Sequence, residues 1–178
     1  MSETTEDPFD LLEIEPAFDI DLPQVRTVVR RRVAACHPDR FQDPEQQAEA
    51  MRQSARLNAA WAAIEDEEVR ANALLARLGG PSASADKSLP PDFLQSMLAV
   101  RMDMEEALAS GDPAERSRVS SWAEDERTRL RESVAALFVR YQAGEDMGTA
   151  IRAELNVWRY IERMIEQLGE QSPGSGVA

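Results

Sequence analysis

Apolar residues recur every three or four positions along most of the chain, a spacing that predicts α-helices. Few stretches alternate with the period of two that a half-buried β-strand requires. The pattern therefore predicts an all-α fold. It places helices near residues 7–12, over about 22–36, from 43 to at least 64, over about 67–78, and, in the second half, over about 92–109, 114–142 and 147–168.

Proline, aspartate and glycine mark the ends of several of these helices. Asp7-Pro8 and Asp43-Pro44 each combine a capping carboxylate with a proline in the first turn. His37-Pro38 ends the helix before it, because a residue that precedes proline is driven out of the helical region. Gly79-Gly80 closes the fourth helix.

Two predicted helix faces in the first half can pack against each other as a hairpin. Both run along one side of their helix at helical spacing. They consist of Leu22, Val25, Val29, Val33 and Cys36 on the first helix, and of Met51, Ala55, Asn58, Trp61 and Ile64 on the second.

The stretch PSASADKSLPP, residues 81–91, has the composition of a linker and divides the chain into two units. The N-terminal unit is predicted over residues 5–80 and the C-terminal unit over residues 92–169. Short connections force consecutive helices to run antiparallel, so the second unit is expected to be a three-helix bundle. Residues 170–178 are predicted to form a disordered tail.

Composition excludes several classes of function. The longest apolar runs are about six residues, far below the roughly 18 that span a membrane. The acidic first residues are unlike a secretory signal, so a cytoplasmic location is expected. One cysteine and one histidine cannot form an internal disulfide or complete a four-ligand zinc site. GxGxxG, GxSxG and Walker-type motifs are absent, and we expect neither an active site nor a cofactor.

Charge is distributed unevenly along a chain whose net charge is −13. Residues 1–21 hold eight acidic residues and no basic one, whereas residues 22–40 hold five arginines and one aspartate. An acidic protein is poorly suited to bind nucleic acid through phosphates. The basic stretch instead matches an acidic patch on another protein.

The sequence His37-Pro38-Asp39 lies between a basic helix and a helix that carries Asn58 and Trp61, about thirty residues after a short apolar helix. This arrangement resembles a J-domain. The resemblance implies that the loop stimulates ATP hydrolysis by a DnaK-class chaperone and that the preceding basic helix contacts an acidic chaperone surface. The residues at the matching positions are His37, Pro38 and Asp39 in the loop and Arg26, Arg30 and Arg31 on the helix.

The resemblance extends to the HscB family of iron–sulfur cluster co-chaperones and covers nearly the whole chain. It is carried by residues 36–41 (CHPDRF), 57–61 (LNAAW) and 70–75 (RANALL), and by the helix that begins at Asp92-Phe93-Leu94. It implies an HscA-class partner for the J-domain and a C-terminal bundle that holds an IscU-type scaffold protein. It also implies no cofactor and no membrane or nucleic-acid partner.

The first helix of the C-terminal unit is apolar on two sides. One stripe fits a bundle core and consists of Phe93, Met97, Val100, Met104 and Ala107 or Leu108. A second, rotated stripe consists of Leu94, Leu98 and Met102, and an apolar patch left exposed usually marks a partner site. On the last helix the expected core residues are Ile151, Leu155, Trp158 and Ile165, with Val157, Tyr160 and Met164 beside them. Together with the resemblance, this predicts scaffold contacts at Leu94, Leu98, Met102, Glu106 and Tyr160.

The chain departs from the family pattern at several positions. Gln95, Ala99 and Met102 replace residues that are often Met or Glu in the family, so the acidic part of the scaffold site is thinner. Arg32 stands where J-domains commonly place a core leucine, and Val33 is expected to take over its packing. Three alternatives stay open: a J-domain protein for a different client, a nucleic-acid adapter that uses the basic helix, and a thiol enzyme that uses Cys36.

Overall fold

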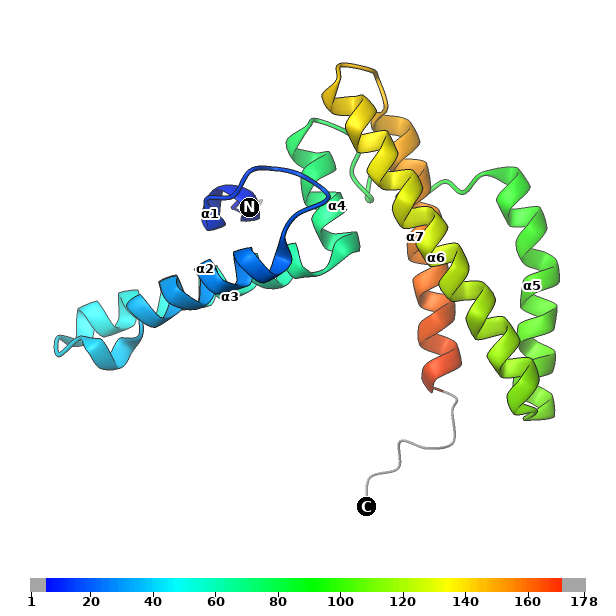
Figure 1. The fold of residues 1–178 in the computed structure, drawn as a ribbon, viewed down its shortest axis with the longest axis horizontal. Coiled ribbons are helices and arrows are strands. Elements are labelled where there is room, and N and C mark those ends of the chain that lie inside the picture. Colours follow the sequence, from blue (N-terminus) through cyan, green and yellow to red (C-terminus); the bar gives the residue numbers. More distant parts are fainter. Residues whose placement is uncertain (1–5, 171–178) are drawn as a thin grey trace. The chain divides into compact units, whose positions relative to one another are not determined.

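The computed structural model describes residues 6–170, and within that range its regular secondary structure is entirely helical (Figure 1). The all-α prediction is confirmed. The chain divides after Gly79 into two compact units, each of which is described by itself. The N-terminal limit predicted at residue 5 and the predicted tail beyond residue 170 lie outside the described residues.

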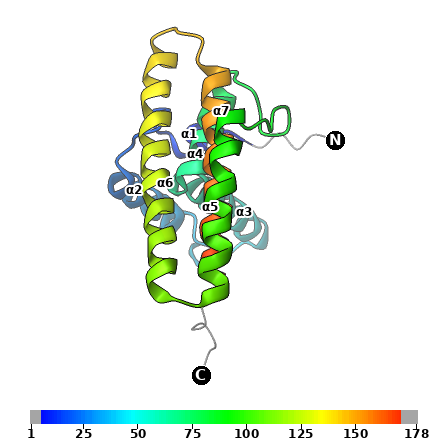
Figure 2. The same cartoon turned by 90° about the vertical axis from the view of Figure 1, so that its right-hand side faces the viewer.

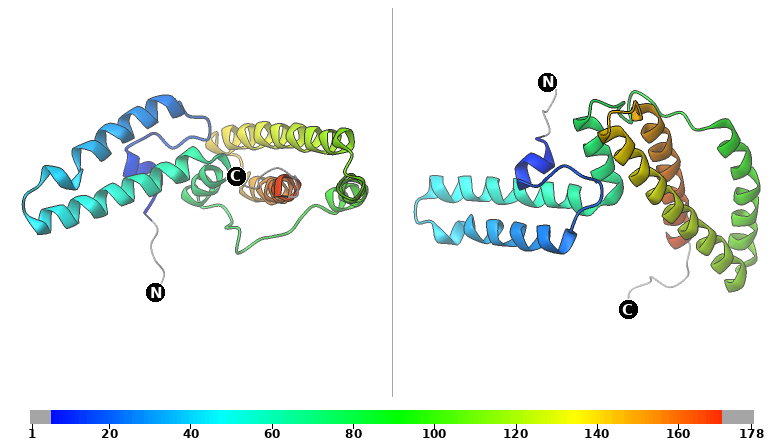
Figure 3. Two further views of the ribbon diagram at one scale, coloured as in Figure 1. Left: turned by 90° about the horizontal axis from the view of Figure 1, so that it is seen from below. Right: turned by 45° about the horizontal axis from the view of Figure 1, so that its top comes forward.

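Unit 1 is built around an antiparallel pair of long helices, α2 and α3, which lie side by side in both views of Figure 3. A short 3₁₀ turn, η1, joins them, α1 packs on α3, and α4 follows α3 after a sharp bend. The bounds are α1 Pro8–Leu12, α2 Leu22–Ala35, η1 Pro38–Arg40, α3 Pro44–Glu65 and α4 Glu67–Arg77.

Aspartate side chains begin most of the helices. The caps of α1, α2, α3, α4 and, in the second unit, α6 each accept a hydrogen bond from a backbone N–H two or three residues ahead, at 2.8–3.2 Å. A carboxylate there also interacts favourably with the positive end of the helix dipole. The caps at Asp7 and Asp43 match the sequence prediction. Gly79 follows α4 with a φ of +80°, a conformation that glycine adopts without strain.

The core of unit 1 corrects the predicted face of α3. Ile64 is buried as predicted, but Met51, Ala55 and Asn58 are exposed, and the helix instead buries Leu57 together with two alanines. Alanine occurs on both sides of this helix, so spacing alone selected the side with the larger side chain, Met51. Small residues on the inner face let neighbouring helices approach closely. The buried apolar residues are Phe9, Leu12, Phe18, Val25, Val29, Ala50, Leu57, Ala60, Ile64, Ala71, Leu74 and Leu75.

Arg70 of α4 is the largest fully buried side chain of unit 1 and leaves only 1% of its surface exposed. Its Nε donates to the carbonyl of Phe18 at 2.8 Å, and its Nη1 donates to the carbonyl of Ile64 at 2.5 Å. The guanidinium lies 5.3 Å from the centre of the Phe18 ring and 3.6 Å from the carboxylate of Glu67. Arg70 therefore ties the segment between α1 and α2 to the junction of α3 and α4.

Unit 2 consists of three antiparallel helices, α5 Pro91–Ser110, α6 Pro113–Gln142 and α7 Gly148–Glu170 (Figure 2). The core prediction for α7 is corrected at Ile165, which is half-buried, whereas Val157, Ile161 and Met164 are buried. Hydrogen bonds join the segment before α5 to α7. The side-chain amide of Asn156 on α7 donates to the carbonyls of Asp86 and Ser88 at 3.2 and 2.9 Å.

A polar cluster joins α6 to α7. Nε and Nη2 of Arg127 donate to the two carboxylate oxygens of Glu162 at 2.7 and 2.6 Å, and the indole N–H of Trp158 donates to the same carboxylate at 2.8 Å. Burial raises the pKa of Glu162, but these hydrogen bonds outweigh burial and leave the pKa below its ordinary value. The cluster therefore stabilises the bundle only while Glu162 is ionised.

The pH dependence of bundle stability tests this cluster. A lowered folded-state pKa contributes stability that is present above the unfolded-state pKa and is lost as the pH falls through the folded value. We expect Glu162→Gln to weaken the bundle by about 1–2 kcal/mol at pH 7 and to lose less stability between pH 5 and pH 3 than the wild type. Amide exchange in α6 and α7 measures both. Glu166→Gln, in a more exposed pair with Arg159 at 3.7 Å, is the control. Parallel losses in wild type and Glu162→Gln would contradict the assignment.

Candidate functional site: two partner-binding surfaces

The loop between α2 and α3 carries the His-Pro-Asp sequence and is internally ordered. His37 leaves the helix with a ψ of 130°, as expected before proline, and its Nδ1 accepts a hydrogen bond from the N–H of Asp39 at 3.3 Å. The N–H groups of Arg40 and Phe41 donate to the carbonyls of His37 and Pro38 at 3.0 Å. These bonds form one 3₁₀ turn that presents Asp39 to solvent.

The far side of the loop is anchored to α3. The side-chain amide of Gln47 donates to the carbonyl of Phe41 at 2.9 Å. His37 and Asp39 are exposed, whereas Pro38 and Phe41 are half-buried. The loop thus has an apolar, fixed side and a polar, accessible side, which suits a rigid contact with a partner protein.

The electrostatics of the loop depend on the protonation of His37. Because Nδ1 accepts from the Asp39 N–H, the neutral ring carries its proton on Nε2. The carboxylate of Asp39 lies 3.5 Å from the same Nδ1 and can pair with it only when the ring is protonated. With the neutral ring, the Asp39 carboxylate is available to a donor on a partner.

The predicted basic face of α2 is exposed. Arg26, Arg30 and Arg31 all lie at the surface, and none has an ion-pair partner among the residues that the structure describes. Arg32 differs from them. Its Nη1 donates to the carbonyl of Leu11 at 3.0 Å, and its Nη2 pairs with Glu13 at 3.0 Å.

Arg32 thereby replaces the packing of a core leucine with polar contacts between α2 and the end of α1. The expectation that Val33 would take over that packing is not met, since Val33 is only half-buried. Arg32 is a structural residue, whereas Arg26, Arg30 and Arg31 are exposed.

The second surface is an apolar stripe on α5. Leu94, Leu98 and Met102 are 47%, 67% and 70% exposed, and their spacing of four residues places them on one side of the helix. The opposite side of α5 buries Met97, Met104 and Ala107 in the bundle. We refer to Leu94, Leu98 and Met102 as the apolar stripe.

Tyr160 and Glu106 complete the predicted scaffold residues. The ring of Tyr160 on α7 packs edge-on against Phe93 of α5, with ring centres 5.4 Å apart, and remains half-exposed. Glu106 is exposed on α5, one turn after Met102. Tyr160 therefore contacts α5 at Phe93, the residue that precedes Leu94.

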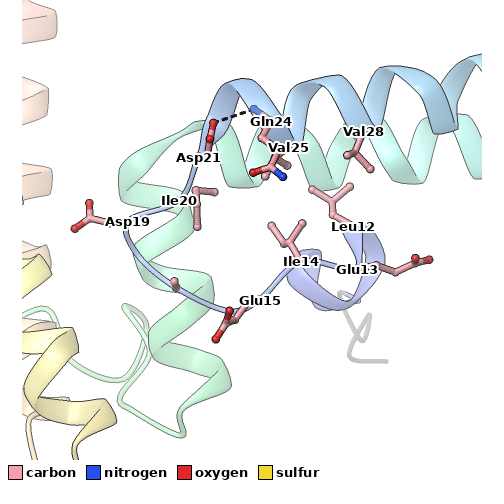
Figure 4. Close-up of a pocket in the computed structure, with 11 residues that line it drawn as sticks. Leu12, Glu13, Ile14, Glu15, Asp19, Ile20, Asp21, Gln24, Val25 and Val28 are labelled. Carbon is pink, nitrogen blue, oxygen red and sulfur yellow. Dashed lines mark hydrogen bonds between the residues drawn. The ribbon is translucent and has the colours of Figure 1, made fainter.

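A groove of about 540 Å³ lies in unit 1 between α2 and the segment that links α1 to α2 (Figure 4). Leu12, Ile14, Ile20 and Val28 face it, and acidic side chains rim it. None of the predicted partner-binding residues lines it. It is therefore separate from the loop surface described above.

Cys36 is a free thiol, and the His, Cys, Asp and Glu side chains of the described residues are possible metal ligands. The Cys36 thiol lies 3.2 and 3.5 Å from the carbonyls of Arg32 and Val33 in the last turn of α2 and donates to them. Within residues 6–170, no three His, Cys, Asp or Glu side chains gather into a group that could hold a metal ion. No helix in this range has the length and apolar character needed to cross a bilayer.

The sequence alone did not identify three further polar features. Buried Arg70 stabilises unit 1, and the Arg127–Glu162 pair stabilises unit 2. Neither spacing nor composition indicates which arginines are buried. A pair of arginines on α5 and α7, Arg101 and Arg163, lines one hollow of unit 2. Only the packing of the two helices brings these residues together.

Comparison with known proteins gives relatives along nearly the whole chain, although no protein-family model matches it. A co-chaperone protein HscB homolog from Bordetella petrii is 27% identical over 171 residues, which cover 94% of this chain and 97% of the relative. One from Neisseria meningitidis serogroup C is 27% identical over 164 residues, covering 90% and 95%.

Two solved structures share the fold. The crystal structure of human co-chaperone protein HscB matches with a TM-score of 0.80 at 18% identity and covers 95% of this chain and 83% of the human chain. Chaperone HscB from Vibrio cholerae matches with a TM-score of 0.77 at 18% identity and covers 92% and 96%.

An antiparallel hairpin with His-Pro-Asp at its tip, followed by a separate helical bundle, defines a J-domain protein with a C-terminal helical domain. The sequence relatives and the solved structures reported above are all HscB proteins. The chain is a homologue of the HscB co-chaperones.

Proposed function

We propose that this protein is a co-chaperone of iron–sulfur cluster assembly that acts in the cytoplasm. Its bundle binds an IscU-type scaffold, and its J-domain stimulates ATP hydrolysis by a DnaK/HscA-class chaperone. The observation that supports the proposal is that the His-Pro-Asp loop and the apolar stripe are exposed on two separate units. Coupling them delivers one partner to the other and promotes cluster transfer.

The J-domain half of the proposal rests on the charges and order of unit 1. Arg26, Arg30 and Arg31 attract an acidic chaperone surface and bring the loop to it. His37 orders the turn, Pro38 fixes its backbone, and Asp39 offers its carboxylate to polar groups of the chaperone. The protein itself performs no chemistry in this scheme and acts on the partner's active site.

The scaffold half rests on the apolar stripe. Three large apolar side chains aligned along one helix are costly to leave in water, and such a patch with polar neighbours is typical of a protein interface. Tyr160 extends the surface onto α7, and Glu106 supplies a charge at its edge. A J-domain co-chaperone that presents a different client is the second candidate, because an apolar stripe by itself does not specify its partner.

Scaffold binding is tested by shortening one residue of the stripe. Burial of Leu98 against a partner contributes about 1.5–3 kcal/mol, so we expect Leu98→Ala to bind an IscU-type scaffold about 10- to 100-fold more weakly. Isothermal titration measures this. Val139→Ala on α6 is a matched control, since Val139 is 68% exposed and lies outside the proposed surface.

The titration also separates the two candidate functions. Equal affinity of Leu98→Ala and wild type for the scaffold would remove the stripe from the interface. No binding by the wild type would leave the J-domain protein with a different client as the better account.

A further inference from the structure

Several arginines in unit 2 are neutralised by carboxylates of the same unit. Arg127, Arg129, Arg140 and Arg159 each form an ion pair with a glutamate, at nitrogen to oxygen distances of 2.5–3.7 Å. Within the described part of the chain, Arg101 and Arg163 have no such partner, although many acidic residues surround them in sequence. Arg118 on α6 is likewise exposed and forms no ion pair among the described residues, so what distinguishes Arg101 and Arg163 is that both line one hollow.

These two arginines line the same hollow between α5 and α7. The hollow measures about 150 Å³, and its other lining residues are Met104, Tyr160, Met164 and Gln167. Two guanidinium groups supply only hydrogen-bond donors, and the tyrosine hydroxyl and glutamine amide can donate as well. No acidic side chain lines the hollow.

Two positively charged residues beside one small hollow favour an anion there over a neutral group or a cation. The planar guanidinium binds a carboxylate through two parallel hydrogen bonds, which makes Arg the residue best suited to that anion. A volume of about 150 Å³ is below the 300–1,000 Å³ typical of sites for whole small-molecule ligands, and it suits a single carboxylate group.

The hollow borders the apolar stripe. Arg101 follows Leu98 by three residues and precedes Met102, so it lies on the edge of the stripe that faces α7. Tyr160 lines the hollow and also contacts Phe93, the residue before Leu94. A partner that covers the stripe therefore places its own surface over the opening between Arg101 and Arg163.

We propose that Arg101 and Arg163 bind an aspartate or glutamate side chain of the partner that covers the apolar stripe. This inference rests on the proposed function, because it assigns the charge of the scaffold surface that the stripe meets. Apolar contacts supply most of the affinity, and the carboxylate fixes the register of the partner along α5. The surface recognised is thus an apolar patch with an acidic residue at one edge.

The test replaces each arginine by glutamine and measures affinity for the scaffold by isothermal titration at 50 and 300 mM NaCl. We expect Arg101→Gln and Arg163→Gln each to bind about 5- to 20-fold more weakly at 50 mM NaCl. The difference from wild type is expected to shrink at 300 mM NaCl, because salt screens the lost interaction. Arg118→Gln is the matched control, since Arg118 is also exposed, lies on α6 and does not line the hollow.

A charge change on the scaffold completes the test. Each acidic residue of the scaffold is replaced in turn by its amide, and affinity is measured with wild type and with Arg163→Gln. For one scaffold residue, the loss of binding free energy in the double variant is expected to be smaller than the sum of the two single losses. Wild-type affinity and salt dependence in both arginine variants, together with weak binding by Leu98→Ala, would overturn this inference and leave the proposed function intact. Unchanged binding by all three variants would overturn both.

A free anion is the remaining occupant to exclude. Sodium acetate is added in place of NaCl at the same ionic strength. If the hollow binds a carboxylate of the scaffold, acetate is expected to weaken scaffold binding only slightly. Acetate binding that is lost in Arg163→Gln, with scaffold affinity unchanged in the same variant, would identify a small-anion site and overturn the inference.

Discussion

Asp39→Asn is expected to abolish stimulation of ATP hydrolysis by a DnaK/HscA-class chaperone while the melting temperature stays within a few degrees of wild type. The Asp39 side chain is exposed and contributes nothing to the core, so the fold does not depend on it. The amide keeps the shape of the carboxylate but removes its charge. A polar contact with a charged partner group loses most of its strength without that charge.

The measurement is the rate of ATP hydrolysis by the chaperone with increasing amounts of wild-type or variant protein. Glu15→Gln is the control, because Glu15 is another exposed acidic residue of unit 1 that lies away from the loop. Full stimulation by Asp39→Asn would mean that the loop acts only as a turn between α2 and α3.

Arg70→Met is expected to destabilise unit 1 by about 3 kcal/mol. The substitution keeps most of the buried volume but removes the donors to the carbonyls of Phe18 and Ile64, and it leaves Glu67 without its buried partner. Each buried acceptor that loses its donor costs about 1–3 kcal/mol, and loss of the pair with the half-exposed Glu67 adds little to this.

Amide exchange in α3 and α4 measures this effect for unit 1 alone, and a loss of about 3 kcal/mol accelerates globally exchanging amides about 100-fold. Arg52→Met is the control, since Arg52 pairs with Glu49 on the exposed side of α3 and its loss is expected to cost under about 0.5 kcal/mol. Equal exchange rates in Arg70→Met and wild type would show that the buried guanidinium is not needed for stability.

The helices were predictable because their ends carry strong local signals. Asp7 and Asp43 cap their helices through their own side chains, and His37 leaves α2 because proline follows it. The apolar stripe was predictable from the spacing of apolar residues around the helix. A helix with Met97 and Met104 in the bundle cannot also bury Leu98, which lies on a different side.

Features that depend on side-chain packing were not predictable. The inner face of α3 is predicted wrongly on the side of Met51, because Met51 and Trp61 lie at helical spacing with Ile64, although Leu57 and not Asn58 faces the core. Arg70 gives no sequence signal of burial, since its acceptors are backbone carbonyls distant in the chain. Arg101 and Arg163 are 62 residues apart, and only the contact between α5 and α7 brings them to one hollow.

Single-turnover ATP hydrolysis by a DnaK/HscA-class chaperone, with and without an IscU-type scaffold, tests the central claim most directly. The account predicts that this protein accelerates hydrolysis alone, and that adding the scaffold accelerates it further than the two separate effects combined. Both effects are expected to disappear in His37→Gln, and the additional effect of the scaffold is expected to weaken in Leu98→Ala. Acceleration that the scaffold leaves unchanged would contradict the coupling of the two surfaces, and no acceleration of any such chaperone would contradict the account as a whole.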